Sequence, residues 1–141
     1  MTPPAAALTG WVVDASVALK WFLPVDREPD GALARSAIER LTMVTTALAI
    51  HEVGNVLTRR SGWTADQIAA ALGLLLEICG EPVDLTVDDH RAAAQLALEH
   101  DLTFYDSSYA VIARRVGRKL LSADRDLLDP GLAVDLRGAL G

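Results

Sequence analysis

The hydrophobic positions along the chain change their spacing several times, from short continuous apolar runs to longer stretches with an apolar residue every three or four positions. The short runs, bounded by polar or turn-forming residues, predict buried strands. These runs lie at residues 10–15, 42–47, 82–87 and 118–124, with a weaker fifth run at 132–136. The longer stretches predict helices. These stretches lie at residues 16–24, 32–41, 48–60, 64–79, 88–101 and 106–117.

Most of the predicted strands are separated by helices of 10–16 residues, which is the length of a crossover between parallel strands. The sequence therefore predicts an α/β fold, a three-layer α/β/α domain around a central, mainly parallel sheet of four or five strands. We expect residues 10–141 to form this single domain and residues 1–9 to be a flexible N-terminus. Ligands of such sheets collect outside the carboxyl ends of the strands.

Turn-forming and capping residues mark where several helices begin and end. Thr64 and Asp88 are N-cap candidates for the two helices that begin with them. Gly62 and Gly80 are the kind of residue that ends a helix. The last long helix is expected to begin at about Asp106.

The composition is typical of a soluble globular protein, with 51% hydrophobic and 23% charged residues in a chain of 141. No apolar run reaches the roughly 18–20 residues of a membrane helix, and the N-terminus lacks the basic segment of a secretory signal. The single cysteine, Cys79, suits a reducing compartment and lies on an apolar helical stripe, where we expect a core position. The sequence thus predicts a cytoplasmic protein with no membrane association.

The formal net charge of −6 argues against binding of nucleic acid over the whole surface, which usually needs a basic footprint. Nucleic acid stays compatible with this charge if the acids are gathered at a metal site and basic residues flank it. The positions of the acids therefore matter more than their number.

Four acids are expected at one edge of the predicted sheet. Asp14 and Asp124 lie at the carboxyl ends of the first and fourth predicted strands. Asp106 opens a helix, and Glu52 lies in the first turns of the helix after the second strand. Four converging carboxylates repel one another unless a cation neutralises them. Ligand sets made only of oxygen atoms suit Mg²⁺ or Mn²⁺.

Three of these acids also have a simpler interpretation. Asp14 and Asp106 could serve only as helix N-caps, and Asp124 could be a first-turn acid favoured by the helix dipole. Glu52 lies inside a predicted helix, where it cannot be a cap. The convergence of all four at one edge favours a site.

Four segments carry a family resemblance, in their order and spacing: "VVDASVALKWF", "HEVGNVL", "LTFYDSSYAVIA" and "LLSADRDL". Together they resemble the PIN-domain nucleases, and specifically the VapC-type toxins of bacterial toxin–antitoxin pairs, from about Trp11 to Asp126. The resemblance implies a Mg²⁺-dependent endoribonuclease in which Mn²⁺ can substitute. It assigns metal binding and catalysis to Asp14, Glu52, Asp106 and Asp124.

The resemblance also implies auxiliary residues. Ser16 corresponds to a small hydroxyl residue two positions after the first acid, and Ser107 follows the third acid. Neither serine has a histidine partner in the local sequence, so we expect hydrogen bonds to a ligand carboxylate or to water instead of nucleophilic attack. Asp126 is a rival or auxiliary ligand beside Asp124.

The expected reaction is hydrolysis of an RNA phosphodiester bond by a water that bound metal ions activate and orient. The same ions would stabilise the charge on the leaving oxygen. Contacts to RNA phosphates are expected from Lys20, Arg59 and Arg125.

By the same resemblance, we expect a small VapB-like antitoxin that covers the active site, and a homodimer. The alternative function is a non-catalytic PIN-like module that binds RNA or protein. A receiver-like phosphoacceptor domain is disfavoured because Asp14 has no adjacent acid and Lys119 begins its strand. A haloacid-type phosphatase is disfavoured because Ser16 occupies the place of that family's second aspartate.

Overall fold

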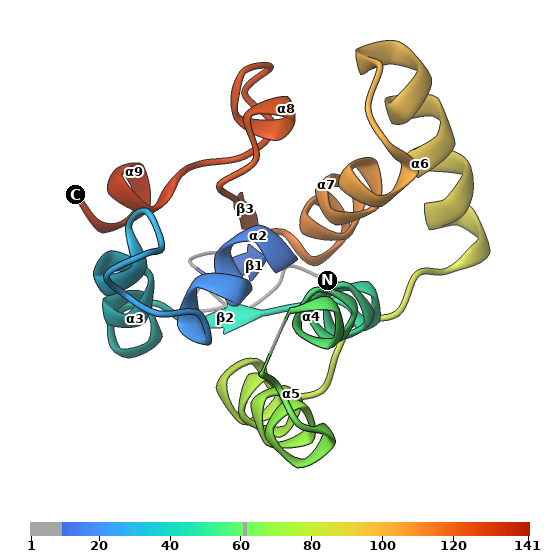
Figure 1. The fold of residues 1–141 in the computed structure, drawn as a ribbon. Helices are drawn as coiled ribbons and strands as arrows, with labels where there is room; N and C mark the ends of the chain where they lie inside the picture. Colours follow the sequence, from blue (N-terminus) through green and yellow to red (C-terminus); the bar gives the residue numbers. More distant parts are fainter. Residues whose placement is uncertain (1–9, 61) are drawn as a thin grey trace.

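The computed structural model describes residues 10–60 and 62–141, so the expected flexible N-terminus at 1–9 lies outside the described residues. At the centre is a parallel sheet of three short strands: β1 (Trp11–Val13), β2 (Met43–Val44) and β3 (Lys119–Leu121). Strand β1 lies between β2 and β3 (Figure 1). The parallel pairing places the carboxyl ends of all three strands at one edge.

The helices of the described residues are α2 (Ala15–Ala18), η1 (Leu19–Trp21, a 3-10 helix), α3 (Gly31–Arg40), α4 (Ala47–Arg59), α5 (Ala65–Cys79), α6 (Val87–His100), α7 (Phe104–Val116), α8 (Arg125–Leu128) and α9 (Leu136–Leu140). The helices predicted at 32–41, 48–60 and 64–79 are confirmed within one residue at each end by α3, α4 and α5. Within the described part of the chain, every helix is too short or too polar to cross a membrane.

Side chains of the strands alternate between the two faces of the sheet, as the pleat of a strand requires. Val12 and Leu120 point to the face covered by α6 and α7, where they join one buried apolar cluster. Val13 and Leu121 point to the other face and pack with residues of α2, α3, α4, α5 and α9. The helices therefore form a layer on each face, which confirms the predicted α/β/α architecture (Figure 1).

The sheet has three strands in the described residues, where four or five were predicted. The segments predicted at 82–87 and 132–136 each form one isolated parallel bridge, Val83 to Thr46 and Val134 to Leu121. Both segments run directly into helix caps, Thr86 for α6 and Asp135 for α9. Because the backbone turns away to start a helix, the pairing ends after one bridge.

One of the two N-cap predictions is confirmed and the other is wrong. Thr64 caps α5 as predicted, with its side chain accepting from the backbone of Gln67. The prediction of Asp88 as the cap of α6 is wrong, because Thr86 holds that position. The hydroxyl of Thr86 accepts from the backbone N–H of Asp89 (3.1 Å), and the Asp89 carboxylate accepts from the backbone N–H of Thr86 (2.9 Å). This reciprocal capping box satisfies two backbone donors at once, which Asp88 alone could not do.

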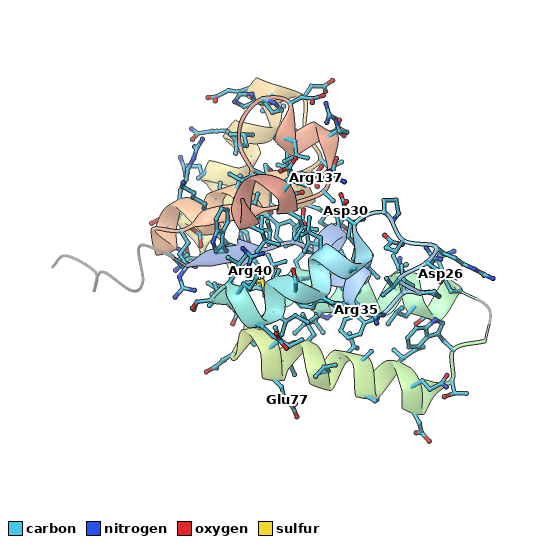
Figure 2. The ribbon with its side chains drawn as sticks, turned by 90° about the vertical axis from the view of Figure 1, so that its left-hand side faces the viewer. Asp26, Asp30, Arg35, Arg40, Glu77 and Arg137 are labelled. Carbon is cyan, nitrogen blue, oxygen red and sulfur yellow. The ribbon has the colours of Figure 1, made fainter. Side chains whose placement is uncertain are left out.

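Helix α9 is fastened to α3 on the face that Figure 2 shows, where Arg40, Arg137 and Asp30 are labelled. Arg40 donates to the carbonyl of Leu140 (2.6 Å), and Arg137 pairs with Asp30 (3.0 Å). The second pair is exposed and adds little stability. Burial of Leu136 and Leu140 in the core therefore holds α9 in place.

Cys79 is buried at the last turn of α5, which confirms its predicted core position. Burial raises the pKa of its thiol to about 12. A thiol with so high a pKa stays protonated at neutral pH and is a poor nucleophile.

Candidate metal centre

Asp14 stands where β1 ends and α2 begins. Its backbone is extended (φ −91°, ψ 176°), as is usual for an N-cap, and its backbone N–H donates to the carbonyl of Leu121 at the end of β3 (3.2 Å). Asp14 therefore lies at the shared carboxyl edge of two parallel strands. This is the edge where parallel sheets bind their ligands.

The carboxylate of Asp14 is 3% exposed and is fixed by three hydrogen bonds. One oxygen accepts from the hydroxyl of Ser16 (2.6 Å) and from the backbone N–H of Val17 (3.2 Å). The other oxygen accepts from the hydroxyl of Ser122 (2.5 Å). Asp14 is thus the cap of α2, and its carboxylate is held in a single orientation. The cap interpretation is confirmed, and the role of Asp14 as a metal ligand stays a prediction.

The same serines position the segment that follows β3. The backbone N–H of Ala123 donates to the Ser16 hydroxyl (2.9 Å), and the backbone N–H of Asp124 donates to the Ser122 hydroxyl (3.0 Å). Asp124 then caps α8 by accepting from the backbone N–H of Asp126 (2.9 Å). A continuous hydrogen-bond network therefore joins Asp14 to Asp124 across the ends of β1 and β3.

Helix α7 brings a third acid to this edge. It begins at Phe104 with Thr103 as its N-cap, two residues earlier than predicted. Asp106 lies in the first turn instead of at the helix start, and its backbone N–H donates to the Thr103 hydroxyl (3.1 Å). Carboxylate oxygens of Asp106, Asp124 and Asp126 lie within 4.8 Å of one another, as three neighbouring ligands of one cation would.

Glu52 reaches the site from α4, the helix that follows β2. Its carboxylate is half-buried and accepts from the phenolic hydroxyl of Tyr109 on α7 (2.9 Å). Tyr109 itself is buried, so this hydrogen bond ties the two helices together from the inside. Glu52 is oriented by a neighbouring side chain, as the serines orient Asp14.

Burial and mutual repulsion raise the pKa of the acids at this edge. Burial raises the pKa of Asp14 to about 6; hydrogen bonds from Ser122 and Ser16 oppose this rise, and the charge of Glu52 adds to it. Burial also raises the pKa of Asp106 to about 7, with further contributions from Asp124 and then Asp14. Neither Asp14 nor Asp106 is in a salt bridge within the described residues, so no paired basic side chain opposes the rise in pKa.

The pKa of Glu52 is also raised above its ordinary value. Burial raises its pKa, the hydrogen bond from Tyr109 opposes the rise, and the charge of Asp124 adds to it. The mutual repulsion links Asp14 to Glu52, Glu52 to Asp124, and Asp106 to both aspartates. Asp106, Asp124 and Asp126 therefore form one group with ligand spacing in the described residues. Asp14 and Glu52 are close enough to interact with Asp106 and Asp124 through their charges, but they lie outside that group.

These donors fit a small divalent cation. All are carboxylate oxygens, which Mg²⁺ and Mn²⁺ prefer over the nitrogen and sulfur ligands of zinc sites. A bound dication would offset the burial and the repulsion that together raise the pKa of Asp14 and Asp106. Ser16, Ser122 and Tyr109 already donate to the carboxylates, as outer partners of metal ligands commonly do.

Some predicted site residues lie elsewhere. The hydroxyl of Ser107 is buried and donates to the carbonyl of Phe104 within α7 (3.0 Å), so it reaches none of the acids. Lys20 is 7% exposed and donates to the carbonyl of Pro29 (2.7 Å) and to Glu28 (3.2 Å). These contacts hold the loop before α3 and remove Lys20 from the surface that RNA could touch.

The other two basic residues are on the surface. Arg59 is exposed in the last turn of α4. Arg125 begins α8 next to Asp124 and pairs with Asp129 (2.7 Å), and both side chains are largely exposed. An exposed pair of this kind is weak, so the Arg125 guanidinium can exchange this partner for another anion.

Two residues of the site were not predicted from the sequence. Ser122 comes two residues before Asp124, at the end of a predicted strand, and its position at the carboxyl edge was a usable signal. Tyr109 comes three residues after Asp106, the spacing that places two side chains on one helix face. Its role depends on where α4 lies, which the local pattern does not contain.

Several known proteins are similar to this chain in sequence or in fold. The family model for the PIN domain matches residues 11–131. Ribonuclease VapC3 from Pyrobaculum aerophilum is 34% identical over 122 residues, which cover 84% of this chain and 92% of that protein. The crystal structure of VapC20 from Mycobacterium tuberculosis, a sarcin-ricin loop cleaving toxin, aligns with a TM-score of 0.72 and 20% identity over 86% of this chain and 95% of that one. A chain of a toxin–antitoxin complex from Klebsiella pneumoniae aligns with a TM-score of 0.71 and 15% identity over 90% and 98%.

Proposed function

This chain belongs to the PIN-domain family, among its VapC-like members, and on that basis we propose that it is a Mg²⁺- or Mn²⁺-dependent endoribonuclease that acts as a toxin. The observation that carries the proposal is the group of carboxylates at the carboxyl edge of the sheet, where burial and mutual repulsion raise the pKa of Asp14 to about 6 and of Asp106 to about 7. Acids left in this state favour an external dication.

The residues that would hold the metal are Asp14, Glu52, Asp106 and Asp124, with Asp126 as an auxiliary ligand. A divalent ion bound there lowers the pKa of a water and neutralises charge that develops on the phosphate during hydrolysis. Ser16 and Ser122 keep both oxygens of Asp14 in place before the substrate arrives. Such preorganisation lowers the cost of assembling the reactive geometry.

The serines of the site are proposed as positioning residues, not nucleophiles. Their hydroxyl protons are directed at the Asp14 carboxylate, and no histidine is among their hydrogen-bond partners in the described residues. Hydrolysis by water is therefore favoured over a covalent intermediate. Arg59 and Arg125 are the proposed contacts to RNA phosphates.

The partner proposed for this chain is a VapB-like antitoxin that covers the acid cluster, with the toxin forming a homodimer in the cytoplasm. The similarity to Ribonuclease VapC3 and to a chain of a toxin–antitoxin complex supports this proposal. A segment that covers the cluster would need a cation facing the acids, because their repulsion is otherwise unrelieved.

Cleavage of a pool of cellular RNA tests the function. Purified, partner-free protein should give discrete products with Mg²⁺ or Mn²⁺ and none with EDTA. Asp106→Asn should give none either, whereas Asp66→Asn should cleave like the wild type. Asp66 is a matched control because it is also a first-turn acid, exposed on α5 and remote from the acid cluster in the chain. Absence of products from folded, metal-loaded wild type would instead favour a non-catalytic binding module.

A further inference from the structure

The two exposed aromatic side chains of the protein are consecutive and directly precede Asp106. The chain has three Trp, two Tyr and two Phe, and all seven lie in the described residues. Tyr105 is 58% exposed and Phe104 is 44% exposed, whereas the other five are buried or half-buried. Single exposed apolar side chains are common on protein surfaces, so the position of these two matters more than their exposure. Both directly precede Asp106 in the chain, so the direction of each side chain decides whether it can reach a ligand held by the acids.

The helix geometry directs Tyr105 toward the acids. Tyr105 and Tyr109 are four residues apart on α7 and so share one stripe of the helix. The hydroxyl of Tyr109 donates to Glu52 on α4 (2.9 Å), which shows that this stripe faces the acid cluster. Tyr105 lies one turn nearer the start of α7, at the exposed rim of the same stripe. From this helix geometry we expect Tyr105 to border the acid cluster.

Phe104 differs in direction although it is the neighbouring residue. Its ring lies 6.3 Å from the ring of His90 on α6, measured between centroids. Successive residues of a helix point about 100° apart, so Phe104 and Tyr105 do not share a face. The neighbouring phenylalanine is thus directed at α6, and it offers an internal control for an exposed aromatic that does not border the acids.

We propose that Tyr105 is a stacking platform for an unpaired nucleobase of the RNA, next to the phosphate that the acid cluster acts on. This inference rests on the proposed function and assigns a substrate-positioning role to Tyr105. A base inside a duplex has both faces covered by its neighbours, so it cannot stack on a side chain at the protein surface. A strand whose phosphate lies at Asp106 brings the adjoining nucleoside to residue 105.

A stacking platform accepts every base, because each has a π-face. Tyr105 should therefore set the requirement for an unpaired base without selecting its identity. It should contribute to binding and leave the chemistry at the acids unchanged.

The test is the affinity for a fluorescein-labelled single-stranded RNA of about 12 nucleotides, within the span of known single-strand sites. Anisotropy is measured with Ca²⁺ in place of Mg²⁺, since Ca²⁺ also binds carboxylates, and a gel confirms that the RNA stays intact. Tyr105→Leu should weaken binding roughly 5- to 150-fold, the range of one lost base stack. Tyr105→Phe should bind like the wild type, and Phe104→Leu should not change the affinity.

A second strand of equal length, built of abasic sugar–phosphate units, separates stacking from charge. Wild type and Tyr105→Leu should bind this strand equally. Equal affinity of wild type and Tyr105→Leu for the base-bearing RNA would overturn the proposal, as would an equal loss on both strands or the absence of wild-type binding.

Cleavage and binding can fail separately. Wild type that binds RNA through Tyr105 but never cleaves it supports the stacking site and contradicts the catalytic function. Wild type that cleaves RNA with Tyr105→Leu unaffected in both KM and affinity supports the catalytic function and contradicts the stacking site. Thermal melting of each variant, expected within the range of the wild type for an exposed position, shows that the protein compared is folded.

Discussion

Asp14 and Asp89 are two buried carboxylates with opposite electrostatics. Their exposed fractions are 3% and 5%, and both accept a backbone N–H at the start of a helix. Asp89 also accepts from the guanidinium of Arg115 (2.9 Å), which lies on α7 beside it. The hydrogen-bond partners of Asp14 are the two hydroxyls of Ser16 and Ser122 and one backbone N–H.

The difference appears in the two pKa values. Burial acts to raise the pKa of Asp89, but the hydrogen bonds from Thr86 and the charge of Arg115 outweigh it, and the pKa falls below its ordinary value. Burial raises the pKa of Asp14 to about 6, because its hydrogen bonds carry no full positive charge and Glu52 adds repulsion. Asp89 is a buried acid with a structural role, and the guanidinium of Arg115 neutralises its charge. Among the described residues, no acid of the cluster is in a salt bridge, which is the physical reason to expect a cation from solution.

The largest effect is expected from removing the charge of each acid in turn. Asp14→Asn should reduce RNA cleavage to less than about one hundredth, since loss of a ligand exceeds the roughly 10–100-fold effect of losing an outer partner. Asp89→Asn should leave cleavage unchanged and lower the free energy of unfolding by about 1–3 kcal/mol, because a charged hydrogen bond to Arg115 is lost. Cleavage assays and urea unfolding measure the two effects. If Asp14→Asn kept full activity, the distinction between the two acids would fail.

A smaller effect is expected from the hydroxyls that orient Asp14. Ser122→Ala removes the donor to one Asp14 oxygen and the acceptor of the Asp124 backbone N–H. Mn²⁺ affinity should fall about 10–100-fold. Ser107→Ala is the matched control, because that hydroxyl is also buried but bonds within α7, and its Mn²⁺ affinity should equal that of the wild type. Equal affinities for both variants would show that the network does not support the metal centre.

The smallest effect is a pH dependence of stability in the metal-free protein. The pKa of Asp14 and Asp106 rises from 3.8 to about 6 and about 7, so folding favours their protonated forms. Their contribution to stability is fully present below their ordinary pKa and is lost as the pH rises through 6 and 7. In EDTA the melting temperature should therefore fall between about pH 5 and about pH 8.

The contribution of Asp89 to the pH dependence of stability has the opposite sign. Its lowered pKa stabilises the fold above the ordinary value, and this contribution is lost only in stronger acid. The Asp89→Asn variant should keep the fall between pH 5 and 8, whereas Asp14→Asn should reduce it. A melting temperature that rises over this interval in EDTA would contradict the account of the acid cluster.

Much of this arrangement could be predicted from the sequence because it depends on local pattern. The spacing of apolar residues predicted α3, α4 and α5 within a residue, and the parallel order of the strands follows from the lengths of the helices between them. The convergence of Asp14 and Asp124 at one edge follows from the same parallel order.

The rest depends on contacts between distant segments. The strand predicted at 82–87 is reduced to one bridge because Thr86, rather than Asp88, begins α6. Lys20 is buried because it donates to Glu28 and to the carbonyl of Pro29 in the loop before α3. The sequence around Lys20 does not predict where that loop lies. The hydrogen bond from Tyr109 to Glu52 joins residues 57 positions apart, so neither neighbourhood predicts it.

Calorimetric titration of the purified protein with Mn²⁺ at about pH 7 tests the central claim most directly. The account predicts saturable binding with release of protons, because carboxyl groups with raised pKa must ionise to become ligands. Binding should be lost in Asp106→Asn and kept in Asp66→Asn. Folded wild type without saturable binding, or Asp106→Asn that binds as tightly as the wild type, would contradict the claim that these acids form a metal centre.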